Sequence, residues 1–531
     1  MKSRSFVGNS VANLASQVVV ALMALVVIPW LLRILGSEGY GLAAFYALLL
    51  QLFMLLDLGL GGLVLRQTAR ASAGGMPVER YLSLVRTVEA FFVVVAVLVS
   101  TAVWFGAGWI AGTWLDGNSL DADVIRRAVE LMALSCGLRW IQVLYKGILA
   151  GLEQFIWLSG FNTLSGAARF LLVIPVLSWI GGDEPILVYL AFQTALSAVE
   201  LLVIYFRKRS TDRNWELAEG TKISISFYVV RSELRFTLML TYSAVIWVLV
   251  LRSADIVLST TLPLAEFGIF SLAVSAAALV VLLVAPVSAV IQPRLTALVT
   301  RSGGETVRGS YLAFSAILGW LALPLGLGLA FAAKPAVEIW TRDEALAEKA
   351  APVLALFAAG NAVLGVCQMC YLIQFARGSL RLHTIANTLF LLLIIPAQIV
   401  LSTRFGAVGA GWAWLGLNVL YLIVWTPVVN HKMLPGIHGS WLGRAILTPL
   451  IFVVPGLTGI WLFISINEEI GSASILILTA VWCGAGLLLG IRRAVNQLPK
   501  QPDTGMMSSF STTTPPSEPE GARKDWGDEK S

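Results

Sequence analysis

The sequence is divided into about fourteen apolar runs, each near the ~20 residues that an α-helix needs to cross the hydrocarbon core of a bilayer. Of all residues, 57% are hydrophobic and 13% are charged, whereas soluble domains carry about 25% charged residues. No soluble core could bury this much apolar sequence. A transmembrane β-barrel would show short alternating segments rather than long continuous runs. The sequence therefore predicts an all-α protein that crosses a membrane many times.

The predicted spans fall into two groups of six, followed by two more. They are 11–32, 41–64, 88–109, 129–150, 155–179, 185–205, 236–258, 267–290, 311–332, 352–373, 384–401, 407–429, 446–464 and 473–491. This pattern predicts an N-terminal six-helix bundle (1–206), a polar cytoplasmic linker (207–235), a C-terminal six-helix bundle (236–430), two additional helices (431–495) and a tail (496–531). The tail is rich in Pro, Ser, Thr and charge, and such a composition predicts disorder.

Basic residues alternate between the two sides of the predicted spans. Arg66, Arg70 and the basic run 207–209 lie on one side, whereas acids such as Asp183 and Glu184 gather on the other. Because cytoplasmic loops are enriched in Lys and Arg, both termini are predicted to be cytoplasmic. Three cations on the acidic side, Arg126, Arg127 and Arg404, are exceptions. The net charge of +6 is then a feature of membrane topology rather than of nucleic-acid binding.

The stretch 32–70, LRILGSEGYGLAAFYALLLQLFMLLDLGLGGLVLRQTAR, reads as the turn between two spans and the whole of the second span. A glycine-containing turn, 36–41, follows the first span, and the second span closes on Arg66 and Arg70. Asp57 lies inside the apolar run. An ionisable group there is costly unless it faces a polar interior. The stretch therefore indicates a membrane protein with a polar interior.

A weak internal repeat relates the two halves. Glu38-Gly39-Tyr40-Gly41 opens the second span, and Glu266-Phe267-Gly268 opens a span after the polar stretch 207–235. Aligning Gly39 with Gly268 pairs the first span with the seventh, which predicts a parallel repeat about an axis normal to the membrane. Chance similarity between two span starts is the alternative. The position of the long polar loop between the halves favours the repeat.

The combination LGSEGYGLAAFY, then DLGL, then a closing Arg, resembles the first hairpin of bacterial polysaccharide (O-antigen type) flippases. These belong to the multidrug/oligosaccharidyl-lipid/polysaccharide (MOP) exporter superfamily. The resemblance implies two six-helix bundles that face each other in a V, plus two C-terminal helices. It also implies an alternating-access transporter, not an enzyme, that moves an undecaprenyl pyrophosphate-linked oligosaccharide across the bacterial inner membrane. Such proteins serve surface polysaccharides (O-antigen, lipopolysaccharide or exopolysaccharide) beside polymerase and chain-length proteins.

Three other functions remain open at this point. A cation-coupled multidrug exporter of the same fold would favour acidic sites in the lobes, and the interior arginines argue against it. A lipid II flippase is a narrower variant of the flippase hypothesis. A membrane glycosyltransferase, polymerase or ligase usually carries a sizeable extracytoplasmic catalytic loop, whereas the predicted outer loops of this chain are short.

Charged residues within spans are the candidate functional groups. Four cations are candidates for substrate binding, and four acids are candidates for ion coupling or for structural roles: Arg139, Lys146, Arg169 and Arg252; Asp57, Glu89, Glu200 and Asp255. A diphosphate headgroup needs fixed cations along its route, and Arg suits this because it stays charged and binds phosphate through two N–H groups. Arg139 and Lys146 are seven residues apart, so they share one helix face.

Each candidate also has a structural alternative. Arg252 and Asp255 are three residues apart and can neutralise each other. Asp57 can pair with an Arg of another span or cap local backbone, and Glu89 can be interfacial beside Arg86. Arg139 and Arg169 are the strongest functional candidates, because no acid lies three or four positions away on their own helices.

The sequence predicts no metal site and no cofactor. Cys367 and Cys370 form a CxxC pair, but within an apolar span such a pair favours packing over redox or metal chemistry. No glycine-rich phosphate loop or nucleotide-binding motif is present, so the chain is not expected to use ATP directly.

Overall fold

The computed structural model describes residues 3–57, 59–115, 117, 119–216, 227–301, 304–467 and 470–498. Within its helices, the side chains of 3–15, 212–241, 243 and 244 are left out of the description. Within these limits the fold is all-α and contains no strand, as the sequence predicts.

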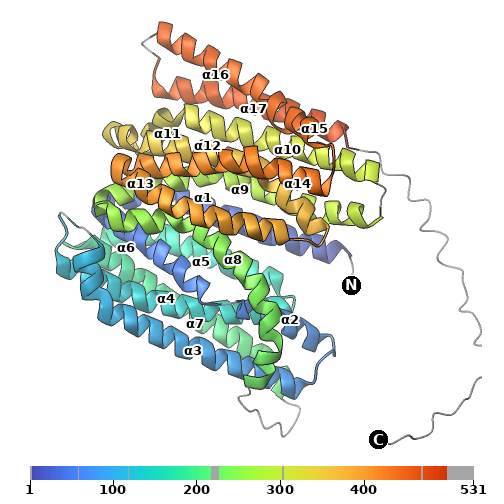
Figure 1. Cartoon of the computed structure of the whole chain (residues 1–531). Coiled ribbons are helices and arrows are strands. Elements are labelled where there is room, and N and C mark those ends of the chain that lie inside the picture. The colour runs from blue at the N-terminus through green and yellow to red at the C-terminus, as the bar shows by residue number, and fades with distance from the viewer. Residues whose placement is uncertain are drawn as a thin grey trace, which may run out of the picture.

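The chain forms a series of long helices joined by short turns (Figure 1). They are α1 (Ser3–Leu55), α2 (Leu60–Ser72), α3 (Val78–Trp109), α4 (Ala122–Gly151), α5 (Phe155–Ala167), α6 (Val173–Ile180), α7 (Pro185–Glu216), α8 (Phe227–Thr261), α9 (Leu264–Arg301), α10 (Gly304–Phe331), α11 (Ala333–Thr341), α12 (Glu344–Ala376), α13 (Arg381–Leu420), α14 (Thr426–Met433), α15 (His438–Leu442), α16 (Thr448–Ile466) and α17 (Ser472–Asn496). Four π-helical segments extend or join these helices: η1 (Ile110–Trp114), η2 (Ala168–Leu172), η3 (Tyr421–Trp425) and η4 (Gly443–Leu447).

Two of the long helical elements, α1 and α13, each form a hairpin of two helical arms joined by a turn. A straight helix of the 53 residues of α1 would be about 80 Å long, more than twice the ~30 Å of a bilayer core. α1 instead leaves helical geometry at Gly36 (φ 72°) and α13 does so at Gly406 (φ 56°), a backbone conformation that glycine adopts readily. Ten helical stretches are long and apolar enough to cross a membrane, and these hairpins are two of them. Counting each hairpin twice and adding α4 and α8 gives about fourteen crossings in the described chain, the predicted number.

The helices form two bundles and a C-terminal pair. In Figure 1, α1–α7 make the lower bundle and α9–α14 lie above it, while α8 runs down from the second bundle in front of the first; α16 and α17 cover the outer side of the second bundle. α17 packs along α10, and an aromatic ladder fixes this contact: Phe452 of α16 stacks on Trp482 of α17 at 4.6 Å and meets the edge of Trp320 of α10 at 5.8 Å. The added pair is therefore attached to the C-terminal bundle.

Parts of the predicted linker and tail lie outside the described residues. α7 continues to Glu216 and α8 begins at Phe227, so helices occupy both ends of the predicted linker, and residues 217–226 are outside the description. The description ends at residue 498, just inside the predicted tail. The domain boundaries drawn from the sequence stay predictions.

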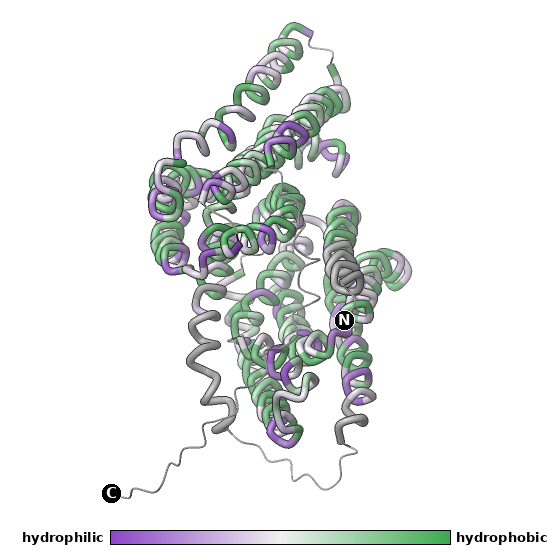
Figure 2. Tube along the Cα trace, turned by 90° about the vertical axis from the view of Figure 1, so that its right-hand side faces the viewer, coloured by the Kyte–Doolittle hydropathy of each residue, from purple (hydrophilic) through white to green (hydrophobic). Residues whose placement is uncertain are grey.

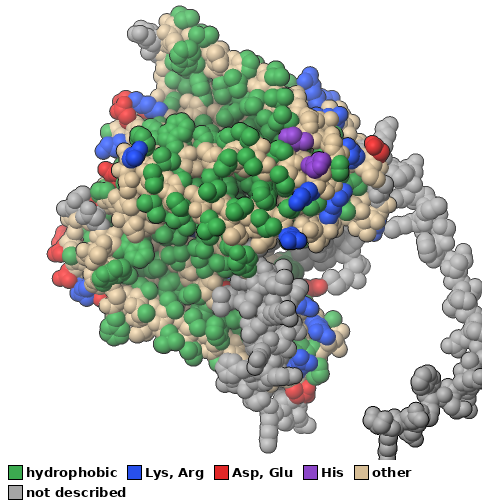
Figure 3. Space-filling view, viewed as in Figure 1, with side chains coloured by type: hydrophobic (Ala, Val, Ile, Leu, Met, Phe, Trp, Pro, Cys, Tyr) green, Lys and Arg blue, Asp and Glu red, His purple; other side chains and the backbone are tan. Residues whose placement is uncertain are grey.

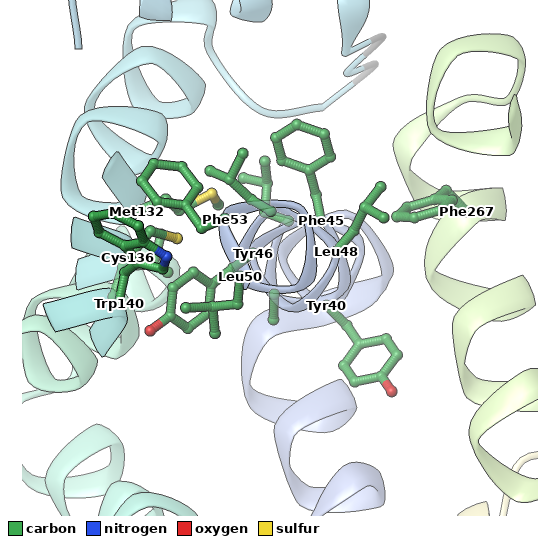
Figure 4. Packing of buried hydrophobic residues seen from close by; sticks show 14 of the residues in the cluster. Tyr40, Phe45, Tyr46, Leu48, Leu50, Phe53, Met132, Cys136, Trp140 and Phe267 are labelled. Carbon is green, nitrogen blue, oxygen red and sulfur yellow. The ribbon is translucent and has the colours of Figure 1, made fainter. Parts of the chain in front are cut away.

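The second arm of α1, residues 37–55, is the central helix of the molecule. Figure 4 looks along it and shows Tyr46 and Phe53 pointing towards Met132 and Trp140 of α4, while Phe45 and Leu48 lie on the side of Phe267 of α9. All seven of these side chains are at most 3% exposed. This arm thus packs against both bundles at once.

The two bundles meet closely at the start of this arm. A Cβ on Gly41 would fall on the backbone carbonyl of Leu264, and one on Gly268 would lie 2.6 Å from the backbone oxygen of Ser37. The two segments that the sequence repeat aligns, around Gly39 and Gly268, therefore lie against each other. Equivalent segments meet in this way near a twofold axis, so the contact supports the repeat over a chance similarity.

The surface divides into an apolar belt and two charged rims. Figure 3 shows hydrophobic side chains across the middle of the molecule, with Lys, Arg and His mostly at the right-hand edge and Asp and Glu mostly at the left. Figure 2, which views the molecule from that right-hand side, shows hydrophobic residues along most of the trace and hydrophilic residues mainly at helix ends. Large apolar residues such as Phe105 and Trp179 are 83% and 92% exposed. Such exposure is expected of side chains that face lipid.

Two of the cations that break the charge alternation are paired with acids. Arg126 contacts Glu130 at 2.8 Å and Asp123 at 3.3 Å, and Arg127 contacts Glu184 at 3.0 Å. These pairs neutralise the positive charge that the two arginines bring to the acidic rim. The exceptions are thus compatible with the predicted orientation.

The predicted orientation can be tested with reporter fusions after Ser72, Asn118, Asn214 and Ser531. They should report cytoplasm, outside, cytoplasm and cytoplasm, because the basic rim is expected to face the cytoplasm. The measurement is paired alkaline phosphatase and green fluorescent protein activity. An outside signal at Ser531 would contradict an even number of crossings.

Gly268→Val should prevent the two bundles from closing at this contact, because backbone lies on both sides and cannot yield as a flexible side chain would. The readout is the reaction of a Leu264→Cys thiol with a membrane-impermeant maleimide, since Leu264 is 2% exposed in this conformation. Labelling should rise with Gly268→Val. It should stay low with the control Gly160→Val, because a Cβ on Gly160 meets nothing within 4 Å. Equal labelling of the two variants would show that the glycine contact does not hold the bundles together.

Candidate substrate-binding site

A buried ion pair lies inside the N-terminal bundle. The Arg169 guanidinium donates from Nη2 to Glu200 Oε2 at 2.7 Å and from Nη1 to Gln193 Oε1 at 2.7 Å. Arg169 is 7% exposed and Glu200 is 5% exposed. Gln142 of α4 adds a longer hydrogen bond of 3.4 Å to the same carboxylate oxygen. The pair therefore joins the η2 segment to α7 and, through Gln142, to α4.

The π-helical segment η2 positions Arg169. In a π-helix the backbone bond reaches one residue further than in an α-helix, which shifts the direction of the side chains and frees carbonyl groups. Gln193 Nε2 donates to the Arg169 carbonyl oxygen at 3.3 Å while its Oε1 accepts from the Arg169 side chain. One amide of α7 thus holds both the backbone and the side chain of Arg169. Glu200 Oε1 has no protein partner among the described residues.

Two further cations lie beside this pair, both on α4. Arg139 is half-buried, and none of the described residues forms a hydrogen bond or an ion pair with its guanidinium. Lys146 is also half-buried, with its Nζ 5.5 Å from the centroid of the Phe161 ring. Arg139 and Arg169 are both close enough to repel the Lys146 ammonium, and Glu200 attracts it. Three cations therefore share a single carboxylate, so this interior carries surplus positive charge.

Hydroxyl and amide groups surround the cluster. Tyr46 Oη and Ser135 Oγ are 2.6 Å apart, and Ser135 Oγ and Ser197 Oγ are 3.2 Å apart. Gln142 Nε2 also donates to the Ser197 carbonyl at 3.0 Å. These contacts connect the second arm of α1 to α4 and α7. They hold the charged groups in a fixed polar frame.

The structure places the remaining predicted candidates elsewhere, each with a local partner. Arg252 Nη1 contacts Asp255 Oδ2 at 3.5 Å on α8, which is the mutual neutralisation considered from their spacing. Asp57 accepts from the Gly61 backbone N–H at 2.8 Å and caps the start of α2, one of its two predicted alternatives. Glu89 accepts from Tyr145 Oη at 2.7 Å and lies 3.9 Å from Arg86. Of the eight candidates, Arg139, Lys146, Arg169 and Glu200 are thus brought together.

Sequence reasoning missed the neutral members of the cluster. Gln193, Ser197 and Glu200 are spaced four and three residues apart, so they form one polar stripe on α7. This spacing in an otherwise apolar span is the signal that could have located the partner of Arg169. Trp157 and Phe161, four apart on α5, were missed in the same way.

The described residues offer little for metal or redox chemistry. They contain no group of three or more His, Cys, Asp or Glu side chains able to hold a metal ion. Cys136, Cys367, Cys370 and Cys483 are buried and unpaired. Within the described part of the chain, the cluster can bind an anion through fixed cations and polar hydrogens.

Comparison with known protein families shows to which family this chain belongs. A family described as polysaccharide biosynthesis protein matches residues 6–299, more than half of the chain. The chain belongs to the polysaccharide biosynthesis protein family. A search of curated proteins finds no match.

Solved structures show how the fold of this family member is shared. The lipid II flippase MurJ, in an inward closed conformation, has a TM-score of 0.69 at 14% identity, with 93% of this chain and 100% of that chain covered. An inward-facing multidrug resistance MATE transporter of the MOP superfamily has a TM-score of 0.63 at 14% identity, with 79% and 94% covered. At this identity the likeness shows the fold alone. The fold is that of MOP transporters.

Arg169→Ala should lower the amount of folded protein, because it leaves Glu200 buried without its ion pair. Removing one partner of a buried pair typically costs about 3–5 kcal/mol. The exchanged pair, Arg169→Glu with Glu200→Arg, should recover part of the loss. The measurement is the yield of monodisperse detergent-extracted protein and its melting temperature.

The matched control is Arg139→Ala, which removes a cation of the same cluster but leaves no described residue without a partner. Its yield should equal that of the unmodified protein. A normal yield and melting temperature for Arg169→Ala would show that the Arg169–Glu200 pair does not hold η2 to α7.

Proposed function

We propose that this protein is a flippase for a lipid-linked oligosaccharide carried on undecaprenyl pyrophosphate. It would act by alternating access in a bacterial inner membrane, with both termini in the cytoplasm, for surface polysaccharide assembly. The carrying observation is the surplus of fixed positive charge within the N-terminal bundle, where Arg139, Lys146 and Arg169 share Glu200. Family membership and the MOP fold support the same function.

The physical task explains why such a cluster would be needed. A sugar diphosphate cannot pass ~30 Å of hydrocarbon unaided, because charged groups lose their hydration there. Fixed cations replace part of that hydration, and no acid among the described residues pairs with Arg139 and would compete with the diphosphate for it. The Arg169–Glu200 pair would hold the cluster in place, and Arg139 and Lys146 would contact the phosphate oxygens. The prenyl chain would remain in lipid throughout.

Lipid II flipping is the second candidate. The observation that favours it is the similarity in fold to a lipid II flippase over nearly the whole chain. Lipid II also presents a diphosphate, so the cation cluster suits both substrates. A multidrug exporter of this fold fits less well, because the acids that such a protein would use for cation coupling have structural partners: Asp57 caps α2 and Asp255 pairs with Arg252.

Arg139→Ala should abolish export of the glycan, or reduce it at least tenfold, while protein level and melting temperature stay normal. The reason is that it removes a binding cation without breaking a structural contact. Arg139→Lys should retain part of the activity, because lysine keeps the positive charge but cannot bind phosphate in the bidentate geometry of a guanidinium. The measurement is restoration of surface polysaccharide in a deletion strain, normalised to protein level.

The same strain distinguishes the candidates. Cytoplasmic-side accumulation of an undecaprenyl-linked repeat unit would support the proposal, and accumulation of lipid II would favour the second candidate. Full export by Arg139→Ala would remove this cluster from the substrate route.

A further inference from the structure

A column of cations and aromatic rings extends from the cluster along α5 to the end of the N-terminal bundle where α7 ends. Trp157 and Phe161 stack with their centroids 5.2 Å apart and their planes at 9°. The Arg207 guanidinium lies 5.5 Å from the Trp157 centroid, and the Lys146 ammonium lies 5.5 Å from the Phe161 centroid. The order Arg207, Trp157, Phe161, Lys146 therefore draws on α4, α5 and α7.

The two cations of this column lack acidic partners among the described residues. Arg207 donates from Nε to the neutral Gln154 Oε1 at 3.0 Å, and the Lys146 ammonium lies over the Phe161 ring. An aromatic face attracts a cation through its quadrupole but carries no net charge. Neither cation has a carboxylate in contact with it in the described residues; Glu200 attracts Lys146 but already binds Arg169. Both positive charges can therefore attract an arriving anion. A carboxylate at either end would have neutralised that charge.

The column leads to the interior cluster. Trp157 and Phe161 are four residues apart, so they lie on one face of α5, and Arg169 follows about two turns after Phe161 in η2. Lys146 belongs to both the column and the cluster. Arg207 is exposed, whereas Trp157, Phe161 and Lys146 are half-buried, so exposure falls towards the cluster.

We propose that Arg207, Trp157, Phe161 and Lys146 form a subsite for the sugar-diphosphate headgroup, which adjoins the cluster through Lys146 and lies at the end of the N-terminal bundle where the substrate enters. This rests on the proposed function and adds to it a site that distinguishes a sugar-bearing diphosphate from a bare one. The diphosphate oxygens draw the Lys146 and Arg207 side chains off the rings. The ring faces that they leave then accept the weakly positive C–H groups of the first sugar, because aromatic faces carry partial negative charge.

The alternative is that the column only fastens α5 to α4 and α7. That role needs no particular ligand, so a change in the rings would alter stability and the binding of every ligand alike. The subsite instead predicts that loss of a ring weakens sugar-bearing ligands and spares the bare diphosphate. The two roles are therefore separable by the choice of ligand.

The experiment measures the affinity of the purified full-length protein for undecaprenyl diphosphate and for undecaprenyl diphosphate carrying one N-acetylglucosamine. Trp157→Leu should weaken binding of the sugar-bearing lipid roughly three- to tenfold and change binding of the bare lipid less than twofold. Trp157→Tyr should retain most of the affinity. The control Trp179→Leu removes a 92% exposed indole from α6 and should change neither affinity.

Lys146→Met keeps the apolar stem, removes the charge and should weaken both lipids. Phe161→Leu provides a second ring variant should Trp157→Leu fail to fold. Equal weakening of the two lipids by both ring variants, or no weakening of either, would overturn the subsite. Unchanged binding of both lipids to Arg139→Ala would instead contradict the proposed function, so the two failures are distinguishable.

Discussion

Placing charge inside a membrane is the constraint on which this structure depends. An isolated cation in the middle of a span costs about 2.5–3.5 kcal/mol on insertion scales, so each one needs a partner or a polar surrounding. Three of the four intramembrane acids have a nearby partner. Asp57 accepts a hydrogen bond at a helix N-terminus, Glu89 accepts one from a tyrosine hydroxyl, and Asp255 pairs with an arginine one turn away. Of the four candidate acids, only Glu200 forms an ion pair with a cation of another helical segment within the described part of the chain. The nearby cations Arg139 and Lys146 are left without an ion pair among the described residues, so this part of the N-terminal bundle carries surplus positive charge.

The two bundles share an architecture but differ in their polar interiors. The N-terminal bundle holds Arg139, Lys146, Arg169 and Glu200, whereas the C-terminal bundle relies more on neutral groups. Tyr311 Oη donates to Asn430 Oδ1 at 2.7 Å, and Trp414 Nε1 donates to Asn361 Oδ1 at 3.0 Å. Neutral networks fix helix positions without attracting an ion from a distance. Among the described residues, the buried ion pair between helices and the cations beside it thus lie in the N-terminal bundle.

Span number, fold class and family could be predicted from the sequence, because hydropathy and the glycine-rich hairpin are local signals. The pairing of the interior charges could not. Arg139 and Arg169 look alike in sequence, since neither has an acid one turn away on its own helix. Arg169 finds its acid 31 residues later on α7, and Arg139 finds none among the described residues. Only the packing of α4, α5 and α7 distinguishes a cation that is held in an ion pair from one that has no such pair among the described residues.

The same packing indicates which motion the fold permits. Within the N-terminal bundle, α4, α7 and η2 are joined by an ion pair and several buried hydrogen bonds, so they can be expected to move as one body. Between the bundles, the hydrogen bonds that cross include those of Arg33 to the Thr341 carbonyl, Trp340 to the Leu25 carbonyl and Trp114 to Ser259. At the glycine contact, backbone meets backbone with no side chain of Gly41 or Gly268 interlocked. Separating the bundles there breaks few directional bonds and leaves the charged cluster intact, so the fold permits the two bundles to rock against each other as rigid bodies.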